Sequence, residues 1–156
     1  MERIRKINDD LAIAGQIALE QLPQIVQTGF RSVLNLRSPQ ETGFLANEQQ
    51  SVERWQLEYV NFPLEGECLD VWTATQVLNQ ISSLPKPVLV HCDNAVRSAA
   101  IVLMHIATSQ GATLDQALNQ AQQLGLFRNE DLIAGDRGIG DREQGQKKSI
   151  TGICDR

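Results

Sequence analysis

The feature that most constrains the fold is an unbroken apolar run, followed by a short polar loop and a second, longer apolar run. The first run, PVLVH at residues 87–91, lacks polar alternation and is typical of a strand buried on both faces of a sheet. The second, SAAIVLMHIATSQ at residues 98–110, is apolar nearly all round and predicts a buried helix. Residues 92–97 therefore join a central strand to a packed helix.

Strand and helix patterns alternate through the rest of the sequence. Further strands are predicted at residues 11–16, 32–36 and 57–62. Further helices are predicted at residues 19–30, 45–56, 71–84 and 113–126. Trp55 and Trp72 are expected on the inner sides of their helices. The alternation predicts the α/β class: a three-layer domain with a mainly parallel central sheet of about four to five strands flanked by helices.

The composition changes near the end of the 156 residues. Residues 1–134 carry the periodic segments and predict one domain with one core. Residues 135–156 are rich in Gly, Asp, Arg, Lys and Gln and show no periodicity, which predicts a flexible polar tail.

The charge argues against two classes of partner. The formal charge is −5 and the isoelectric point about 5.0, so we expect neither nucleic-acid binding nor binding to acidic membranes. No apolar run approaches the roughly 18 residues of a membrane span, and the N-terminal MERIRKINDD lacks the apolar core of a signal peptide. We expect a cytoplasmic location.

The cysteines and histidines indicate neither disulfides nor a metal. Cys68, Cys92 and Cys154 form no C-x-x-C pair, and His91 and His105 have no second type of ligand nearby in the sequence. Neither a disulfide framework nor a zinc site is expected.

The loop at residues 92–97 combines a nucleophile with an anion clamp. It follows the carboxyl end of the predicted central strand, where ligands bind in open α/β sheets. Loop amides and the helix N-terminus favour an anion there, and the same field favours the thiolate form of Cys92. Arg97 adds a planar guanidinium suited to an oxyanion. The Ser98 hydroxyl could donate a hydrogen bond to the Cys92 sulfur and help it leave in a second catalytic step.

His91-Cys92, four residues, then Arg97-Ser98 resembles the signature of the cysteine-dependent phosphatase and rhodanese superfamily. The wider sequence is similar to one branch, the phosphatase-like domain found alone or fused to metallo-β-lactamase-like hydrolases. The similarity rests on the order of LAIAGQ, SVLNLRSPQE, LEYVNFPL and PVLVHC, and it covers roughly Leu11 to Leu126.

The resemblance implies a phosphatase-like fold and a two-step phosphoryl transfer. Cys92 would attack phosphorus, Arg97 and the loop would hold the phosphoryl oxygens, and water would hydrolyse the cysteinyl-phosphate. No metal or other cofactor is implied, and the substrate would be a phosphorylated small molecule or a phosphoprotein. The implied phosphate-binding loop comprises Asp93, Asn94, Ala95 and Val96.

The loop departs from the common pattern in three ways. Tyrosine and dual-specificity phosphatases have five residues between Cys and Arg, whereas this loop has four, as rhodaneses do. Ala95 stands where the family usually has glycine, which reaches positive φ without steric cost. Asp93 places a negative charge beside the expected anion.

The sequence offers several candidates for a general acid and one for a further substrate contact. The family usually carries an Asp after the strand that matches YVNFP, where Gly66 falls in this sequence. The nearby candidates are Glu65, Glu67 and Asp70. Arg37, at the end of another predicted strand, is a candidate substrate contact; its alternative is a surface ion pair with Glu41.

Three other interpretations stay open at this point. Cys92 could form a persulfide in a rhodanese-type sulfurtransferase, since the six-residue loop has the rhodanese length. The domain could be a degenerate phosphatase that binds an anion or a partner without turnover, as Ala95, Asp93 and the displaced acid suggest. Cys92 could also be an inert buried cysteine.

Overall fold

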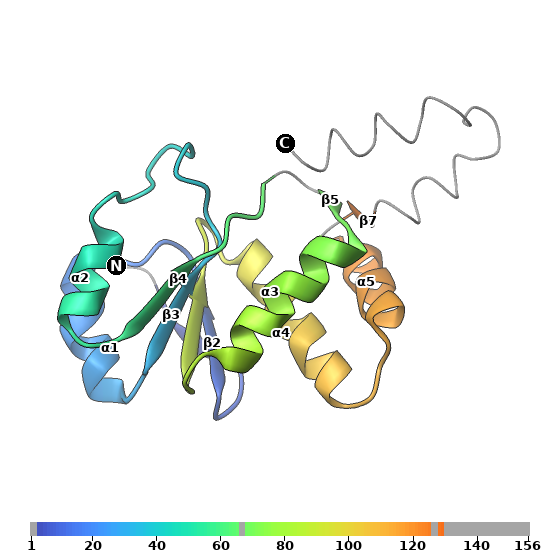
Figure 1. Ribbon diagram of the computed structural model, residues 1–156, viewed down its shortest axis with the longest axis horizontal. Helices are drawn as coiled ribbons and strands as arrows, with labels where there is room; N and C mark the ends of the chain where they lie inside the picture. The colour runs from blue at the N-terminus through green and yellow to red at the C-terminus, as the bar shows by residue number, and fades with distance from the viewer. Residues whose placement is uncertain (1–2, 66–67, 126–127, 130–156) are drawn as a thin grey trace.

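The computed structural model describes residues 3–65, 68–125 and 128–129, and five strands there form one sheet (Figure 1). Its strand order is β1-β2-β6-β3-β4, with β1 antiparallel and the rest parallel. The strands are β1 (Arg5–Lys6), β2 (Leu11–Ala14), β3 (Ser32–Asn35), β4 (Glu58–Asn61) and β6 (Val88–His91). A separate parallel pair joins β5 (Cys68–Leu69) to β7 (Arg128–Asn129).

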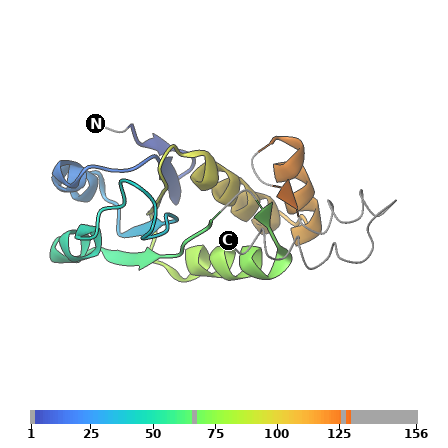
Figure 2. The ribbon, with the colours of Figure 1, turned by 90° about the horizontal axis from the view of Figure 1, so that it is seen from above.

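Helices cover both faces of the sheet, which gives three layers (Figures 1 and 2). One face carries η1 (Leu19–Gln21), α1 (Leu22–Thr28) and α2 (Glu48–Arg54). The other face carries α3 (Val71–Ser83), α4 (Val96–Ser109) and α5 (Leu114–Gln123). The predicted fold class is confirmed. The short strands β1, β5 and β7 were not predicted, because two residues are too few to show a periodic pattern.

Alternation along the strands divides the core into two clusters. Leu34, Val88 and Val90 face α3, α4 and α5, whereas Val33 and Leu89 face α1 and α2. All five are fully buried, and each such side chain contributes about 1.5–3 kcal/mol through removal of apolar surface from water. The apolar run that predicted a strand buried on both faces is therefore central β6.

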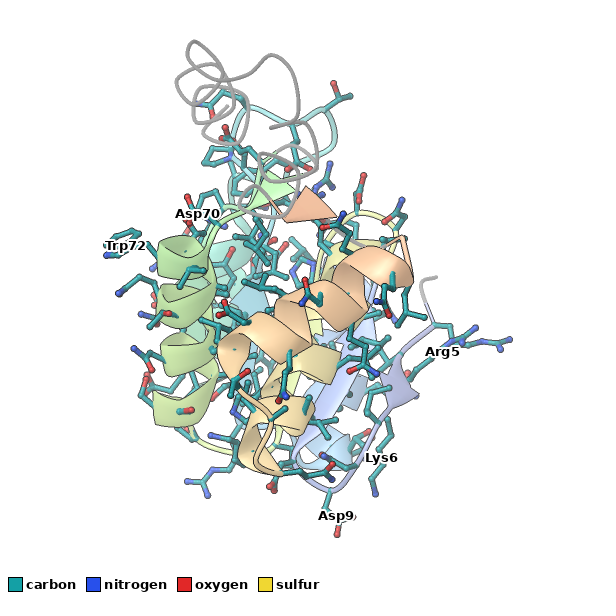
Figure 3. All side chains as sticks on the ribbon, turned by 90° about the vertical axis from the view of Figure 1, so that its right-hand side faces the viewer. Arg5, Lys6, Asp9, Asp70 and Trp72 are labelled. Atoms are coloured by element: carbon teal, nitrogen blue, oxygen red, sulfur yellow. The ribbon has the colours of Figure 1, made fainter. Side chains whose placement is uncertain are left out.

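Both tryptophans are exposed, contrary to the sequence prediction. Trp72 is 70 % exposed and points outward from the start of α3 (Figure 3). The buried side of α3 is formed by Ala74, Val77, Leu78 and Ile81, which have regular helical spacing. Trp55, 44 % exposed, follows the last turn of α2, so it does not share the inner side of that helix.

Two predictions extend beyond this fold. The proposed boundary between residues 1–134 and 135–156 lies outside the described residues, as does the predicted tail. Across the part of the chain that the structure describes, no helix is both long and apolar enough to cross a membrane.

Candidate active site

The site lies where the parallel strands end in register. Ala14 of β2 pairs with His91 of β6, His91 pairs with Asn35 of β3, and Asn35 pairs with Asn61 of β4. Hydrogen bonding continues one residue further, since Cys92 N donates to Ala14 O at 3.2 Å. The segments after β2, β3, β4 and β6 are thus brought to one edge of the sheet, as the sequence predicted for the loop at 92–97.

The Cys92–Arg97 loop turns tightly into α4. Ala95 adopts the left-handed conformation with φ +74° and forms the N-cap of α4, so the helix begins at Val96, two residues before the expected Ser98. The backbone therefore takes the conformation that favours glycine even though alanine occupies the position. The Val96 amide donates to Asn94 Oδ1 at 3.1 Å, so this loop amide is satisfied within the loop.

Cys92 is fully buried beneath this loop and packs with the apolar core on the α3–α5 side. Ser98 is buried as well, and its hydroxyl is directed to Ala14 O at 3.4 Å. Burial of the thiol is compatible with the inert-cysteine interpretation.

The Glu41 carboxylate binds the Arg97 guanidinium through two hydrogen bonds. Its Nη1 donates to Glu41 Oε2 at 2.8 Å and its Nη2 to Glu41 Oε1 at 3.0 Å, the bidentate geometry typical of arginine–carboxylate pairs. Nη1 also donates to Leu64 O at 2.8 Å. The pKa of Arg97 is raised mainly by the Glu41 hydrogen bonds, which outweigh burial, and the hydrogen bond to Asp93 raises it further.

Glu41 reaches Arg97 from a tight turn after β3. Glu41 N donates to Ser38 O at 2.9 Å, and Ser38 N donates back to Glu41 Oε2 at 2.8 Å. Burial alone would raise the pKa of Glu41. Hydrogen bonds from Arg97, the Ser38 amide and Arg37 outweigh it and lower that pKa from 4.5 to about 2. Glu41 is therefore an ionised partner of Arg97 at neutral pH.

Arg37 supports Glu41 from the interior. It is only 4 % exposed, so the ion pair with Glu41, which the sequence suggested as a surface pair, is buried at 3.0 Å. The remaining guanidinium nitrogens donate to Gln16 Oε1 and to Thr42 O. Gly43, at φ +91°, packs beside that guanidinium, where an added Cβ would lie 3.4 Å from Nη2. Arg37 remains a candidate substrate contact only by prediction, since its three nitrogens already have partners.

A cavity of about 530 Å³ opens over Arg97. It is lined by Ser38, Gln40, Glu41, Glu65, Asp93 and Arg97. Asp93, whose side chain is 48 % exposed, accepts a hydrogen bond from Arg97 Nη2 at 3.0 Å. The expected unfavourable charge of Asp93 is therefore neutralised by Arg97. An incoming anion would compete with Asp93 for the outer side of the guanidinium.

The three general-acid candidates fall in different places. Glu65 is exposed and lines the cavity. Asp70 is the N-cap of α3 and accepts from the Thr73 amide at 2.7 Å, which gives its carboxylate a capping role (Figure 3). Glu67 lies outside the described residues.

The sequence indicates His91 as a structural hydrogen bonder under the loop, but its partner Glu48 was missed. His91 Nε2 and Glu48 Oε2 are hydrogen-bonded at 2.5 Å, and both side chains are fully buried. Gln16 Nε2 donates to Glu48 Oε1 at 2.9 Å. Burial and then the negative charge of Glu48 raise the pKa of nearby Tyr59 to about 12. The only sequence signal was polar residues placed at strand and helix ends, which is too common to identify this group.

Fold and site together define a phosphatase-like α/β domain: a cysteine at the end of a central parallel strand, an arginine in the first turn of the following helix, and a cavity that the arginine lines. A family model described as "Beta-lactamase hydrolase-like protein, phosphatase-like domain" matches residues 3–112. The chain belongs to this family.

The proteins and solved structures to which the chain is similar share 30 % or less of its sequence. It is 30 % identical over 134 residues to the beta-lactamase hydrolase-like protein of Xylella fastidiosa strain 9a5c, covering 83 % of this chain but 30 % of that protein. A DUF442 protein from Shewanella putrefaciens CN-32 superposes with a TM-score of 0.64, at 20 % identity and 76 % coverage of each chain. P. aeruginosa TpbA, solved in complex with pTyr, has a TM-score of 0.60 at 17 % identity, covering 82 % of this chain and 76 % of that chain.

Proposed function

We propose that the protein hydrolyses phosphate monoesters, with Cys92 as nucleophile and Arg97 as the group that binds the phosphoryl oxygens. The observation that carries the proposal is the Arg97 guanidinium, which Glu41 fixes beside the cavity in the first turn of the helix that follows Cys92 and β6. The family assignment favours phosphoryl transfer over sulfur transfer. The substrate class is a phosphorylated small molecule or a phosphoprotein.

The reaction would proceed in two steps. In the first, the Cys92 thiolate forms an S–P bond while the P–O bond to the leaving group breaks, and the leaving oxygen takes a proton from an acid or from water. In the second, water attacks phosphorus, the S–P bond breaks, and phosphate and the thiolate are released. Arg97 and the amides of Asp93, Asn94 and Ala95 stabilise the charge that develops on the phosphoryl oxygens. Glu65 is the acid candidate that lines the cavity.

The test compares hydrolysis of an aryl phosphate by the wild type, Cys92→Ser and Arg97→Lys. Lysine keeps the charge of Arg97 but loses the fork that Glu41 holds, so we expect each variant to lose at least about 100-fold in kcat/KM. Arg54→Lys, at an exposed position, is the matched control and should keep the wild-type rate. Equal rates for the wild type and Cys92→Ser would refute the proposal.

A second candidate function is anion binding without turnover. Two observations favour it: Cys92 is fully buried, and Asp93 already occupies the outer side of Arg97. It predicts that inorganic phosphate binds, more tightly in Asp93→Asn because the competing charge is removed, while no phosphate ester is hydrolysed. Calorimetry together with the hydrolysis assay separates the two candidates, since turnover that depends on Cys92 excludes simple binding.

A further inference from the structure

Polar side chains form a continuous hydrogen-bonded path around the Cys92–Arg97 loop, from the residue before Cys92 to Arg97 itself. His91 contacts Glu48 at 2.5 Å, and Glu48 contacts Gln16 at 2.9 Å. Gln16 then accepts from Arg37 at 2.8 Å. The path ends where Glu41 binds both Arg37 and Arg97. We call this path the loop-flanking network; it comprises His91, Glu48, Gln16, Arg37, Glu41 and Arg97.

Gln16 is the one neutral amide in the loop-flanking network. Glu48 Oε1 accepts a hydrogen bond from Nε2 of the amide, whereas Arg37 can only donate and therefore requires the Oε1 of the amide as its acceptor. A carboxylate in its place would repel Glu48, and a cationic side chain would repel Arg37. Glutamine therefore satisfies both buried charged neighbours at once.

The backbone of Gln16 contacts the loop directly. Its amide donates to Asp93 O at 3.2 Å, one residue beyond Cys92. Gln16 thus binds the start of the loop through its main-chain amide. Its side-chain oxygen binds Arg37, which in turn is paired with Glu41, the partner of Arg97. Gln16 ends the LAIAGQ segment, whose final residue the proposed reaction leaves without a role.

We propose that Gln16 is a positioning residue that fixes the guanidinium of Arg97 relative to Cys92. The inference rests on the proposed function, because it concerns the same site. Glu48 is fully buried and Arg37 is 4 % exposed, so neither can replace a lost hydrogen bond with bulk water. Loss of the amide forces both groups to find new partners. Arg37 then no longer holds Glu41 in place, and Glu41 no longer holds the fork of Arg97.

The test measures how Cys92 reacts with a negatively charged and a neutral alkylating reagent. Rates with iodoacetate and iodoacetamide are followed by peptide mapping of Cys92, and the affinity for inorganic phosphate is followed by calorimetry. Gln16→Met has similar length but no hydrogen bonds. We expect its iodoacetate rate to fall at least fivefold relative to its iodoacetamide rate, and its phosphate affinity to fall about tenfold. The matched control Gln24→Met, at an exposed position on α1, should leave both unchanged.

The comparison of the two reagents separates positioning from a general loss of structure. If both reagents change by the same factor in Gln16→Met, or if their ratio stays within twofold of the wild type, the inference is overturned. Should Gln16→Met not fold, Gln16→Asn keeps a neutral amide that is too short to reach both Glu48 and Arg37, and it is expected to lower the ratio in the same direction. Since alkylation requires no turnover, a wild type that hydrolyses no phosphate ester would refute the proposed reaction and leave this result to decide the role of Gln16.

Discussion

At the scale of single residues, Ala95 is where local preference and the fold disagree. Its φ of +74° is a left-handed conformation that costs alanine about 1–2 kcal/mol relative to the right-handed form. The turn is nevertheless formed, since it connects the buried end of β6 to the buried helix α4. The sequence identified Ala95 as the unusual position, since glycine is usual there, and the backbone takes the conformation that favours glycine.

Ala95→Gly should therefore stabilise the protein. Removing Cβ relieves the left-handed strain, and we expect the free energy of unfolding to rise by about 1 kcal/mol in urea denaturation. Ala99→Gly, three residues into the helix, is the matched control and should lower it by about 1 kcal/mol. A loss of stability in both variants would show that Ala95 carries no strain.

The residues of the site were only partly predictable. Cys92 and Arg97 were found because the loop between two apolar runs is local in sequence. Glu41 was noticed only as a partner of Arg37, and Gln16 and Glu48 were not proposed for the site at all. Their contacts depend on which strands are neighbours in the sheet, with Gln16 and Glu48 separated by 32 residues. Sequence spacing carries no information about such long-range pairs.

At the scale of elements, the turn after β3 governs the charge of the site. The backbone of Ser38–Glu41 aims one carboxylate at two guanidinium groups, Arg37 and Arg97. The element itself was predicted, since SVLNL reads as a strand and RSPQETG as the loop after it. The contact of the Glu41 side chain with Arg97 was not predicted, because the two residues are 56 positions apart in the sequence.

This arrangement predicts a specific dependence of stability on pH. The folded pKa of Glu41 is about 2, below its ordinary value of 4.5. Its contribution is therefore complete above about pH 4.5 and is lost as the pH falls toward 2. We expect Glu41→Gln to lower the free energy of unfolding by about 1–3 kcal/mol at pH 7 and to reduce the slope between pH 4.5 and 2.

Unfolding in urea at a series of pH values checks this dependence. The exposed Glu20→Gln is the control and should follow the wild-type curve. An unchanged slope between pH 4.5 and 2 in Glu41→Gln would contradict the assignment of Glu41 as the ionised partner of Arg97.

At the scale of the whole molecule, the three layers and the parallel sheet follow from the sequence. Strand and helix segments alternate along the sequence, which predicts parallel pairing of the strands. Successive residues of each strand face opposite sides of the sheet, so apolar residues in a row predict helices on both faces. The chain spans about 30 % of the length of the curated relatives it matches. The domain has its own two core clusters and its own site at the carboxyl edge of the sheet.

The central claim is that Cys92 becomes covalently phosphorylated during hydrolysis, and a rapid-quench experiment tests it most directly. The wild-type protein is mixed with an aryl phosphate, denatured within the first turnovers, digested, and analysed by mass spectrometry. We predict a phosphoryl group on the peptide that contains Cys92, and none on the same peptide from Cys92→Ser. Release of phosphate with no phosphoryl group on Cys92 at any quench time, accompanied by undiminished turnover in Cys92→Ser, would contradict the account.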